Sequence, residues 1–172
     1  MKVLEKTRGK PVISDDSQQL VSFVVGHELF GVSILAVQEI IRMETITPIP
    51  NAPEFIEGVI NLRGKVIPIV DLKKRLNIIS ESQGEKEKKR ILVIEVAERI
   101  IGFIVDAVSE VMKITTESIE PPPDIVVAGV ESEYIQGVSK LDDNLLILLD
   151  FGKIFQNREV ETLSNAELLE VG

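Results

Sequence analysis

The sequence predicts an all-β fold of two small barrels packed on each other, and three observations support this. Residues 20–42 match residues 91–113 at a constant offset of 71, and residues 55–76 match residues 134–155 at a constant offset of 79. The blocks keep their order in both halves, so the chain is a tandem duplication. Each copy carries about five short β-rich runs, separated by segments long enough for only one helical turn. A unit of about 65 residues is marginal as an independent core, so the two barrels are expected to bury a common interface.

The first repeat predicts five strands, at 20–25, 29–32, 39–43, 57–62 and 65–70. Gly26-His27-Glu28 indicates a hairpin turn between the first two strands. Ser33 can cap a short helical turn at 34–37. Prolines within 47–50 end the third strand, because proline cannot donate a hydrogen bond to a ladder.

The later half of the first repeat predicts a tight hairpin. A single helical turn is expected at 52–55. Arg63-Gly64 forms a two-residue turn between the last two strands, since its glycine can adopt a positive φ. Pro68 indicates an edge position or a bulge in the final strand. Asp71 then caps the short helix that follows.

The second repeat predicts strands at 91–96, 100–105, 111–114, 134–140 and 145–149. Asp106 is expected to cap a helical turn that reaches Glu110. The prolines at 121–123 replace the proline stop of the first repeat, in a loop longer by eight residues. Asp150 caps a last short helix that ends at Phe155.

Composition outside the repeats sets the domain boundaries. Residues 1–18 are charged and aperiodic, which predicts a flexible tail. The polar run 81–89 is the clearest linker. The ordered domain is therefore expected at 19–157, with the first barrel at about 19–80 and the second at about 90–157, or with the two intertwined. Residues 158–172 are expected to form a C-terminal helix or tail.

Several function classes are disfavoured by composition. The chain of 172 residues has no cysteine and one histidine, so we expect no metal site and no cofactor. Its apolar runs are too short to span a bilayer and it has no signal-peptide pattern, so a cytoplasmic location without membrane insertion is expected. A net charge of −9 and the scarcity of aromatic residues argue against nucleic-acid binding, a role that small barrels often take.

One enzymatic alternative comes from the duplication itself. Asp71 and Asp150 occupy the same repeat position, so pseudo-symmetry could pair two carboxylates as in a pepsin-like acid hydrolase. Neither aspartate has the Asp-Thr/Ser-Gly sequence of such sites, because Asp71 is followed by Leu-Lys and Asp150 by Phe-Gly. Capping of a helix accounts for both residues, so no catalytic site and no enzyme activity are expected.

Other candidate residues favour an interaction surface. Arg63 projects from a rigid turn, where its planar guanidinium could anchor an interface or remain an ordinary exposed charge. The apolar stripe of Ile34, Val37, Ile40 and Ile41 fits a core, although its position near the seam between the barrels could also receive a partner helix. His27 is expected to be an exposed turn residue, and the glycines of 58–64 lack a phosphate-binding pattern.

Three segments resemble the CheW-like domain family of bacterial chemotaxis. They are residues 30–40 (FGVSILAVQEI), 48–53 (PIPNAP) and 55–72 (FIEGVINLRGKVIPIVDL). The similarity covers roughly residues 19–155, and the most specific part is 58–71. It implies two five-stranded SH3-like barrels around a shared hydrophobic core. It also implies an adaptor, or scaffold, in two-component signal transduction that joins chemoreceptors to the CheA histidine kinase.

The resemblance also implies site residues by motif. The groove that receives the hairpin tip of a chemoreceptor is expected to include Val37, Glu39, Ile40, Gly58 and Arg63. Contacts with the related regulatory domain of the kinase are expected near Gly102, Asp106 and Val108. The chain lacks the extra domains of the CheV type and of the kinase, so a stand-alone adaptor is expected, monomeric in isolation, with micromolar pairwise contacts that several partners strengthen together.

Overall fold

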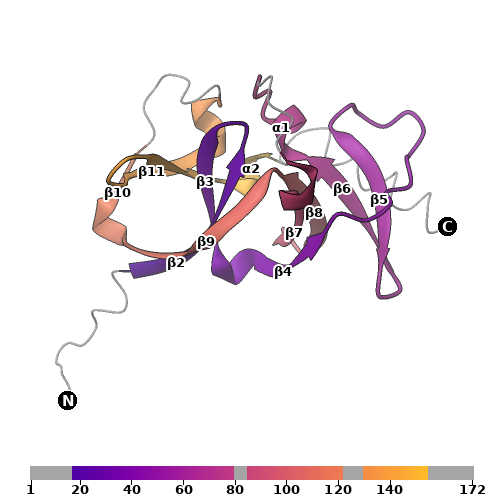
Figure 1. Ribbon diagram of the computed structural model, residues 1–172, viewed down its shortest axis with the longest axis horizontal. Helices are drawn as coiled ribbons and strands as arrows, with labels where there is room; N and C mark the ends of the chain where they lie inside the picture. Colours follow the sequence, from indigo (N-terminus) through magenta and orange to yellow (C-terminus); the bar gives the residue numbers. More distant parts are fainter. Residues whose placement is uncertain (1–16, 80–84, 122–129, 155–172) are drawn as a thin grey trace, which may run out of the picture.

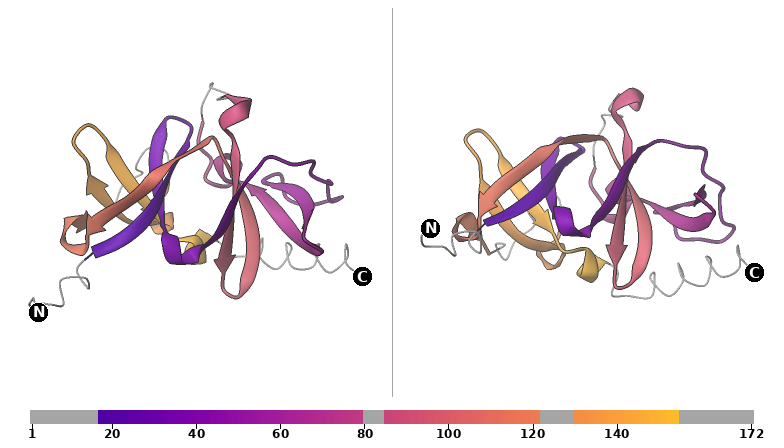
Figure 2. Two further views of the ribbon diagram at one scale, coloured as in Figure 1. Left: turned by 60° about the horizontal axis from the view of Figure 1, so that its bottom comes forward. Right: turned by 90° about the horizontal axis from the view of Figure 1, so that it is seen from below.

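The computed structural model describes residues 17–79, 85–121 and 130–154, most of which lie in β-strands. The strands form two sheets, one with the order β10-β11-β12-β3-β2-β9 and one with the order β4-β7-β8-β6-β5. Figures 1 and 2 show the two sheets curled into barrels that lie side by side. The expected all-β class with SH3-like barrels is confirmed.

The six-stranded sheet contains β2 (Ser17–Val25), β3 (Glu28–Ser33), β9 (Ala107–Thr115), β10 (Ile119–Glu120), β11 (Ile135–Lys140) and β12 (Leu145–Leu149). The five-stranded sheet contains β4 (Val37–Arg42), β5 (Ile56–Leu62), β6 (Lys65–Asp71), β7 (Arg90–Val96) and β8 (Arg99–Val105). Short helices connect them: η2 (Ile34–Ala36), α1 (Leu72–Arg75), η3 (Lys86–Lys88), η4 (Thr116–Ser118), η5 (Ser132–Tyr134) and α2 (Phe151–Ile154).

The two repeats exchange strands. β4 of the first repeat pairs with β7 of the second, which places Val37 opposite Ile94. β9 of the second repeat pairs with β2 of the first, which places Val108 opposite Phe23. The repeat offset of 71 relates Val37 to Val108 and Phe23 to Ile94, so the two pairings are equivalent under a pseudo-twofold symmetry.

The parallel pairings repeat this exchange. Ile69 of β6 lies opposite Gly102 of β8, and Leu148 of β12 lies opposite Gly31 of β3. Each sheet therefore contains strands from both copies, and neither sheet coincides with the stretches 19–80 or 90–157. Each repeat therefore supplies strands to both sheets.

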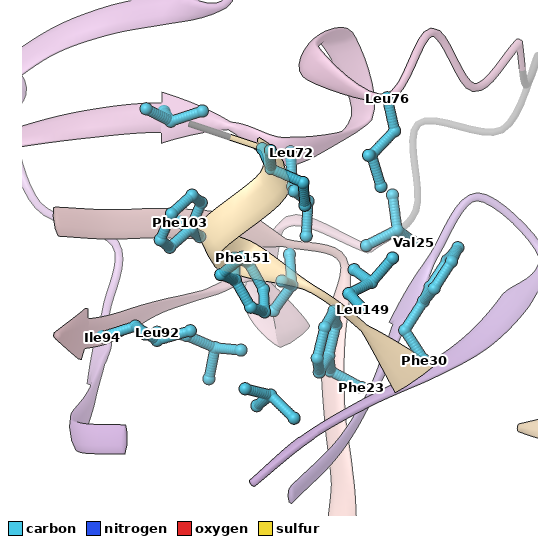
Figure 3. Close-up of a cluster of buried hydrophobic side chains, with 14 of the residues drawn as sticks. Phe23, Val25, Phe30, Leu72, Leu76, Leu92, Ile94, Phe103, Leu149 and Phe151 are labelled. Carbon is cyan, nitrogen blue, oxygen red and sulfur yellow. The ribbon is translucent and has the colours of Figure 1, made fainter. Parts of the chain in front are cut away.

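A shared core joins the two sheets (Figure 3). Phe23 and Phe30 of the six-stranded sheet stack with their ring centroids 6.0 Å apart. Phe103 of the other sheet packs against Phe151 of α2, with 4.8 Å between the ring centroids. All four rings belong to one cluster of buried residues, which also includes Leu92. Two smaller clusters fill the interiors of the individual barrels.

Several predicted elements differ from the structure. Residues 52–55 form no helical turn: only Glu54 and Phe55 lie in a turn, and Asn51 takes a positive φ of 61°. The turn expected after Asp106 is part of β9, because a bulge lets this strand follow β2. β2 begins at Ser17, inside the expected N-terminal tail. The expected C-terminal helix or tail at 158–172 lies outside the described residues.

Pro68 lies in a strand with neighbours on both sides, not at an edge. β6 pairs with β5 along its length, where Pro68 lies opposite Val59. The parallel pairing with β8 covers only Ile69 to Asp71. Proline is tolerated because its position lies outside this second ladder.

Candidate functional site

The two repeat-related aspartates cap separate helices. Asp71 Oδ1 accepts hydrogen bonds from the backbone N–H of Lys73 at 3.0 Å and of Lys74 at 3.4 Å. Asp150 Oδ1 accepts one from the backbone N–H of Lys153 at 3.1 Å. Burial raises the pKa of Asp71, and the charged neighbours that act on it are Glu57 and Lys74. The acid pair of a hydrolase is therefore not formed by these residues.

Arg63 and Glu39 form an ion pair at the open side of the five-stranded barrel. Arg63 has a φ of 50° and Gly64 a φ of 85°, as a type I′ hairpin turn requires at both central positions. The Asn61 side chain stabilises the turn, because its Oδ1 accepts from the backbone N–H of Gly64 at 2.8 Å. The Arg63 side chain is 71% exposed and that of Glu39 is 27% exposed, so a rigid turn presents the guanidinium to solvent.

This ion pair joins the two edges of one sheet. β4 and β5 are the outer strands of the five-stranded sheet, and Glu39 lies on β4 while Arg63 follows β5. A backbone bridge between Thr47 and Val59, with both hydrogen bonds at 2.9 Å, closes the same side. A cavity of about 340 Å³ lies beside the ion pair, and its apolar lining residues are Leu62, Ile67, Val93 and Ile100.

A bulge at Gln38 directs the side chains of β4. Val37 lies opposite Ile94, whereas Glu39 lies opposite the adjacent residue Val93. Val37 therefore packs on the shared core, and Glu39 faces the side of the barrel interior. Ile40, the next residue, lies on the shared-core side and is 41% exposed. The three expected receptor-binding residues on β4 thus occupy both faces of this edge strand.

Gly58 is buried and acts through the backbone. Its φ is 145°, and a Cβ built there would lie 2.0 Å from the carbonyl oxygen of Thr47. The repeat-related Gly137 is similarly confined, since a Cβ at that position would lie 2.6 Å from the side chain of Ile119. Both glycines therefore permit close approach of neighbouring strands, and Gly58 offers a partner no side chain.

The three expected kinase-binding residues lie in different environments. Gly102 is buried against Ile69 and Ile91. Asp106 Oδ2 accepts from the backbone N–H of Gly26 at 2.7 Å and forms an ion pair with Lys73 at 3.3 Å. Val108 lines an open cavity between the sheets. Gly102 is buried, whereas Asp106 and Val108 are both half-buried.

Comparisons with known proteins identify the family. The model of the CheW-like domain matches residues 19–159. The chain belongs to the CheW-like domain family. It is 34% identical to the chemotaxis protein CheW of Treponema pallidum over 94% of this chain and 96% of that protein. It is 36% identical to the CheW of Klebsiella aerogenes over 86% of this chain and 87% of that protein.

A solved structure supports the same assignment. The scaffolding protein TtCheW from Thermoanaerobacter tengcongensis matches with a TM-score of 0.75 and 40% sequence identity. The match covers 83% of this chain and 94% of the other. The CheW-like fold therefore extends over almost the whole described part of the chain.

Two features of this CheW-like domain were missed in the sequence. Arg75 is a buried arginine at the position where the second repeat has Ile154, and aligning the repeats could have shown a charge at an apolar site. Arg42 and Arg90 lie directly opposite each other on β4 and β7. No local pattern signals this second feature, because it depends on the register between strands of different repeats.

Within the described residues, no three histidine, cysteine, aspartate or glutamate side chains are grouped to hold a metal ion. The described segments also contain no helix with the length and apolar character needed to cross a membrane. His27 is exposed in the β2–β3 turn, as expected.

Proposed function

We propose that this protein is a non-enzymatic cytoplasmic scaffold of bacterial chemotaxis, which couples chemoreceptors of the methyl-accepting type to the CheA histidine kinase. Family membership over residues 19–159 and the near full-length match to proteins named CheW support the proposal. The observation on which it most depends is the Glu39–Arg63 ion pair, because it joins two residues of the family's receptor motif on a rigid, accessible edge.

The receptor surface consists of the edge strand β4 and the Arg63-Gly64 turn beside it. Ile40 supplies an exposed apolar contact and Arg63 an exposed guanidinium that can bind carboxylates or amide oxygens. Val37 is half-buried beside the shared core, so it supports the position of Ile40. Gly58 acts indirectly, since it allows the 43–55 loop to lie against β5.

The kinase surface is centred on Val108 and is supported by the other two expected residues. Asp106 connects the β2–β3 turn to α1 and therefore positions the start of β9. Gly102 permits the close packing of β8 on β6 in the interior of the five-stranded barrel. Contacts of this kind are usually modest in area, so we expect micromolar pairwise affinity.

Pull-down with a chemoreceptor cytoplasmic fragment tests the proposal. We expect Arg63→Glu to reduce capture of the fragment by about tenfold or more, because it removes an interface anchor and repels Glu39. Lys140→Glu is the matched control, since Lys140 is also exposed, at 76%, but lies in the other sheet. Equal capture by wild type and Arg63→Glu would contradict the assigned surface.

A further inference from the structure

Two arginines end the ladder between β4 and β7. Arg42 lies directly opposite Arg90. The preceding pair, Ile41 and Ile91, packs in the interior of the five-stranded barrel. Since side chains alternate along a strand, the arginine pair lies on the opposite face, which is also the face of Leu92 and the shared core. Both guanidinium groups therefore belong to the seam between the two barrels.

This arrangement has a cost in the isolated protein, because like charges directly opposite each other destabilise a sheet. Arg90 Nη1 donates to the backbone carbonyl oxygens of Glu87 and Lys89, both at 2.8 Å. These acceptors are neutral, so they do not neutralise the charge of the guanidinium group. Arg42 is exposed and forms no ion pair with any residue in the ranges that the structure describes.

A cavity of about 400 Å³ opens beside the pair, between β7 and β9. Lys88 and Arg90 line it from η3 and β7, and Val24, Ala107, Val108 and Ser109 line it from β2 and β9. Figure 2 shows η3, which contains Lys88, at the end of the seam between the barrels. The surface is thus apolar on one side and cationic on the other.

The local charge contrasts with that of the whole chain. The protein has a net charge of −9, yet Lys86, Lys88, Lys89, Arg90 and Arg42 lie on adjoining segments at this end of the seam. Glu85 and Glu87 lie in the same segment, and Glu85 pairs with Lys88 at 3.5 Å between two well exposed side chains. Such exposed pairs contribute little, so the cluster keeps a positive field that attracts anionic groups.

We propose that Arg42, Arg90 and Lys88 bind carboxylates on the flank of a partner helix whose apolar stripe lies against Ile40, which shares the face of β4 that carries Arg42. The inference rests on the proposed function, because the helix is that of the chemoreceptor hairpin. The arginines select a receptor segment with acidic residues beside its apolar face, and partner carboxylates relieve the repulsion between the two guanidinium groups.

The test compares binding and stability of one variant, Arg42→Glu. Opposite charges across β4 and β7 should leave the melting temperature unchanged or raise it. Its affinity for a purified chemoreceptor cytoplasmic fragment should fall about three- to tenfold at low salt, with a weaker salt dependence than wild type. Arg99→Glu is the matched control, since Arg99 lies on β8 at the far end of the β7–β8 ladder.

A second arm uses a fragment whose exposed glutamates and aspartates near the hairpin tip are changed to amides. Arg42→Glu should then cause no further loss, because the carboxylates that it repels are gone. Unchanged affinity and salt dependence in Arg42→Glu, while Arg63→Glu abolishes binding, would overturn the inference and leave the proposed function intact. Failure of the wild-type protein to bind any receptor fragment would overturn both.

Discussion

Arg75 Nη2 donates a hydrogen bond of 2.6 Å to the backbone carbonyl oxygen of Ile154. The two residues are equivalent, since they are separated by the repeat offset of 79 and end α1 and α2 respectively. The bond therefore joins the two copies across their pseudo-twofold axis. Arg75 is buried, with 6% of its surface exposed.

Two aromatic rings at another pair of equivalent positions enclose the same guanidinium. The Cζ atom of Arg75 lies 5.1 Å from the ring centroid of Phe55 and 5.1 Å from that of Tyr134. Its Nη1 also donates to the Tyr134 hydroxyl at 3.3 Å. A desolvated cation between two ring faces is worth roughly 2 kcal/mol or more. Arg75 therefore helps fix one barrel against the other.

Arg75→Ala should lower the free energy of unfolding by about 2–4 kcal/mol, because it removes the ring contacts, a charged hydrogen bond and buried methylene groups. Arg75→Lys should recover only part of this loss, since an ammonium lacks the planar guanidinium. Urea denaturation measures the stability loss of both variants, provided that the m-value is unchanged. A loss below about 0.5 kcal/mol, as expected for a surface change such as Arg99→Ala, would contradict the role of Arg75.

Gly58→Ala should destabilise the protein more than Gly64→Ala. A methyl group at Gly58 would lie 2.0 Å from the Thr47 carbonyl oxygen, whereas nothing lies within 4 Å of one at Gly64. Both positions have positive φ, so Gly64→Ala carries a backbone cost of about 1 kcal/mol and Gly58→Ala adds a steric clash. Faster amide exchange at Thr47 and Val59 in Gly58→Ala would show that the barrel closure has opened. Equal stability of the two variants would rule out this account.

Asp71 gives the protein a specific dependence on pH. Its pKa is raised above the ordinary 3.8, chiefly by burial. The folded state therefore binds more protons than the unfolded state between 3.8 and the raised pKa, and stability falls as the pH increases through this window. The Asp71→Asn variant keeps a capping oxygen and does not titrate. The stability of this variant relative to wild type should therefore rise as the pH increases through this window and then remain constant at higher pH.

Thermal unfolding of both proteins across this pH range measures the effect. Asp71→Ala, which removes the cap, should lose about 1 kcal/mol and serves as the control for capping. A stability difference between the Asp71→Asn variant and wild type that does not change with pH would contradict the effect of burial.

The Glu39–Arg63 pair can be tested by exchanging its charges. The single variants Glu39→Arg and Arg63→Glu place like charges together at the barrel edge, while the double variant restores the ion pair in reverse. The double variant should regain stability lost by either single change, by about 0.2–1 kcal/mol for an exposed pair. It should not regain receptor binding, since the exposed guanidinium is then on the other strand. Full recovery of binding would show that barrel closure alone is required.

Sequence reasoning predicted most of the strands because each is short, apolar and bounded by turn residues. It also predicted the Arg63-Gly64 turn and the caps at Asp71 and Asp150, which depend on local chemistry, although the cap expected at Asp106 was wrong. The exchange of strands between repeats could not be derived, because β4 would satisfy the same pattern whether it paired with its own repeat or with β7.

In the candidate site, too, the features that depend on pairing between distant strands could not be predicted from local sequence. The grouping of Glu39 with Arg63 depends on barrel closure between the two edge strands, which no local pattern encodes. Kinase contacts were expected near Gly102, and local sequence did not reveal that this glycine permits close packing against β6. Arg42 and Arg90 were not singled out, because their opposition requires the register of the exchanged ladder.

The most direct test of the scaffold function is reconstitution of kinase control from purified parts. CheA autophosphorylation is measured with receptor-containing membranes, with and without this protein. We expect the kinase to come under receptor control only when the wild-type protein is present, and Arg63→Glu to fail to establish that control while remaining folded. Equal receptor control of the kinase in the absence of this protein would contradict the scaffold function.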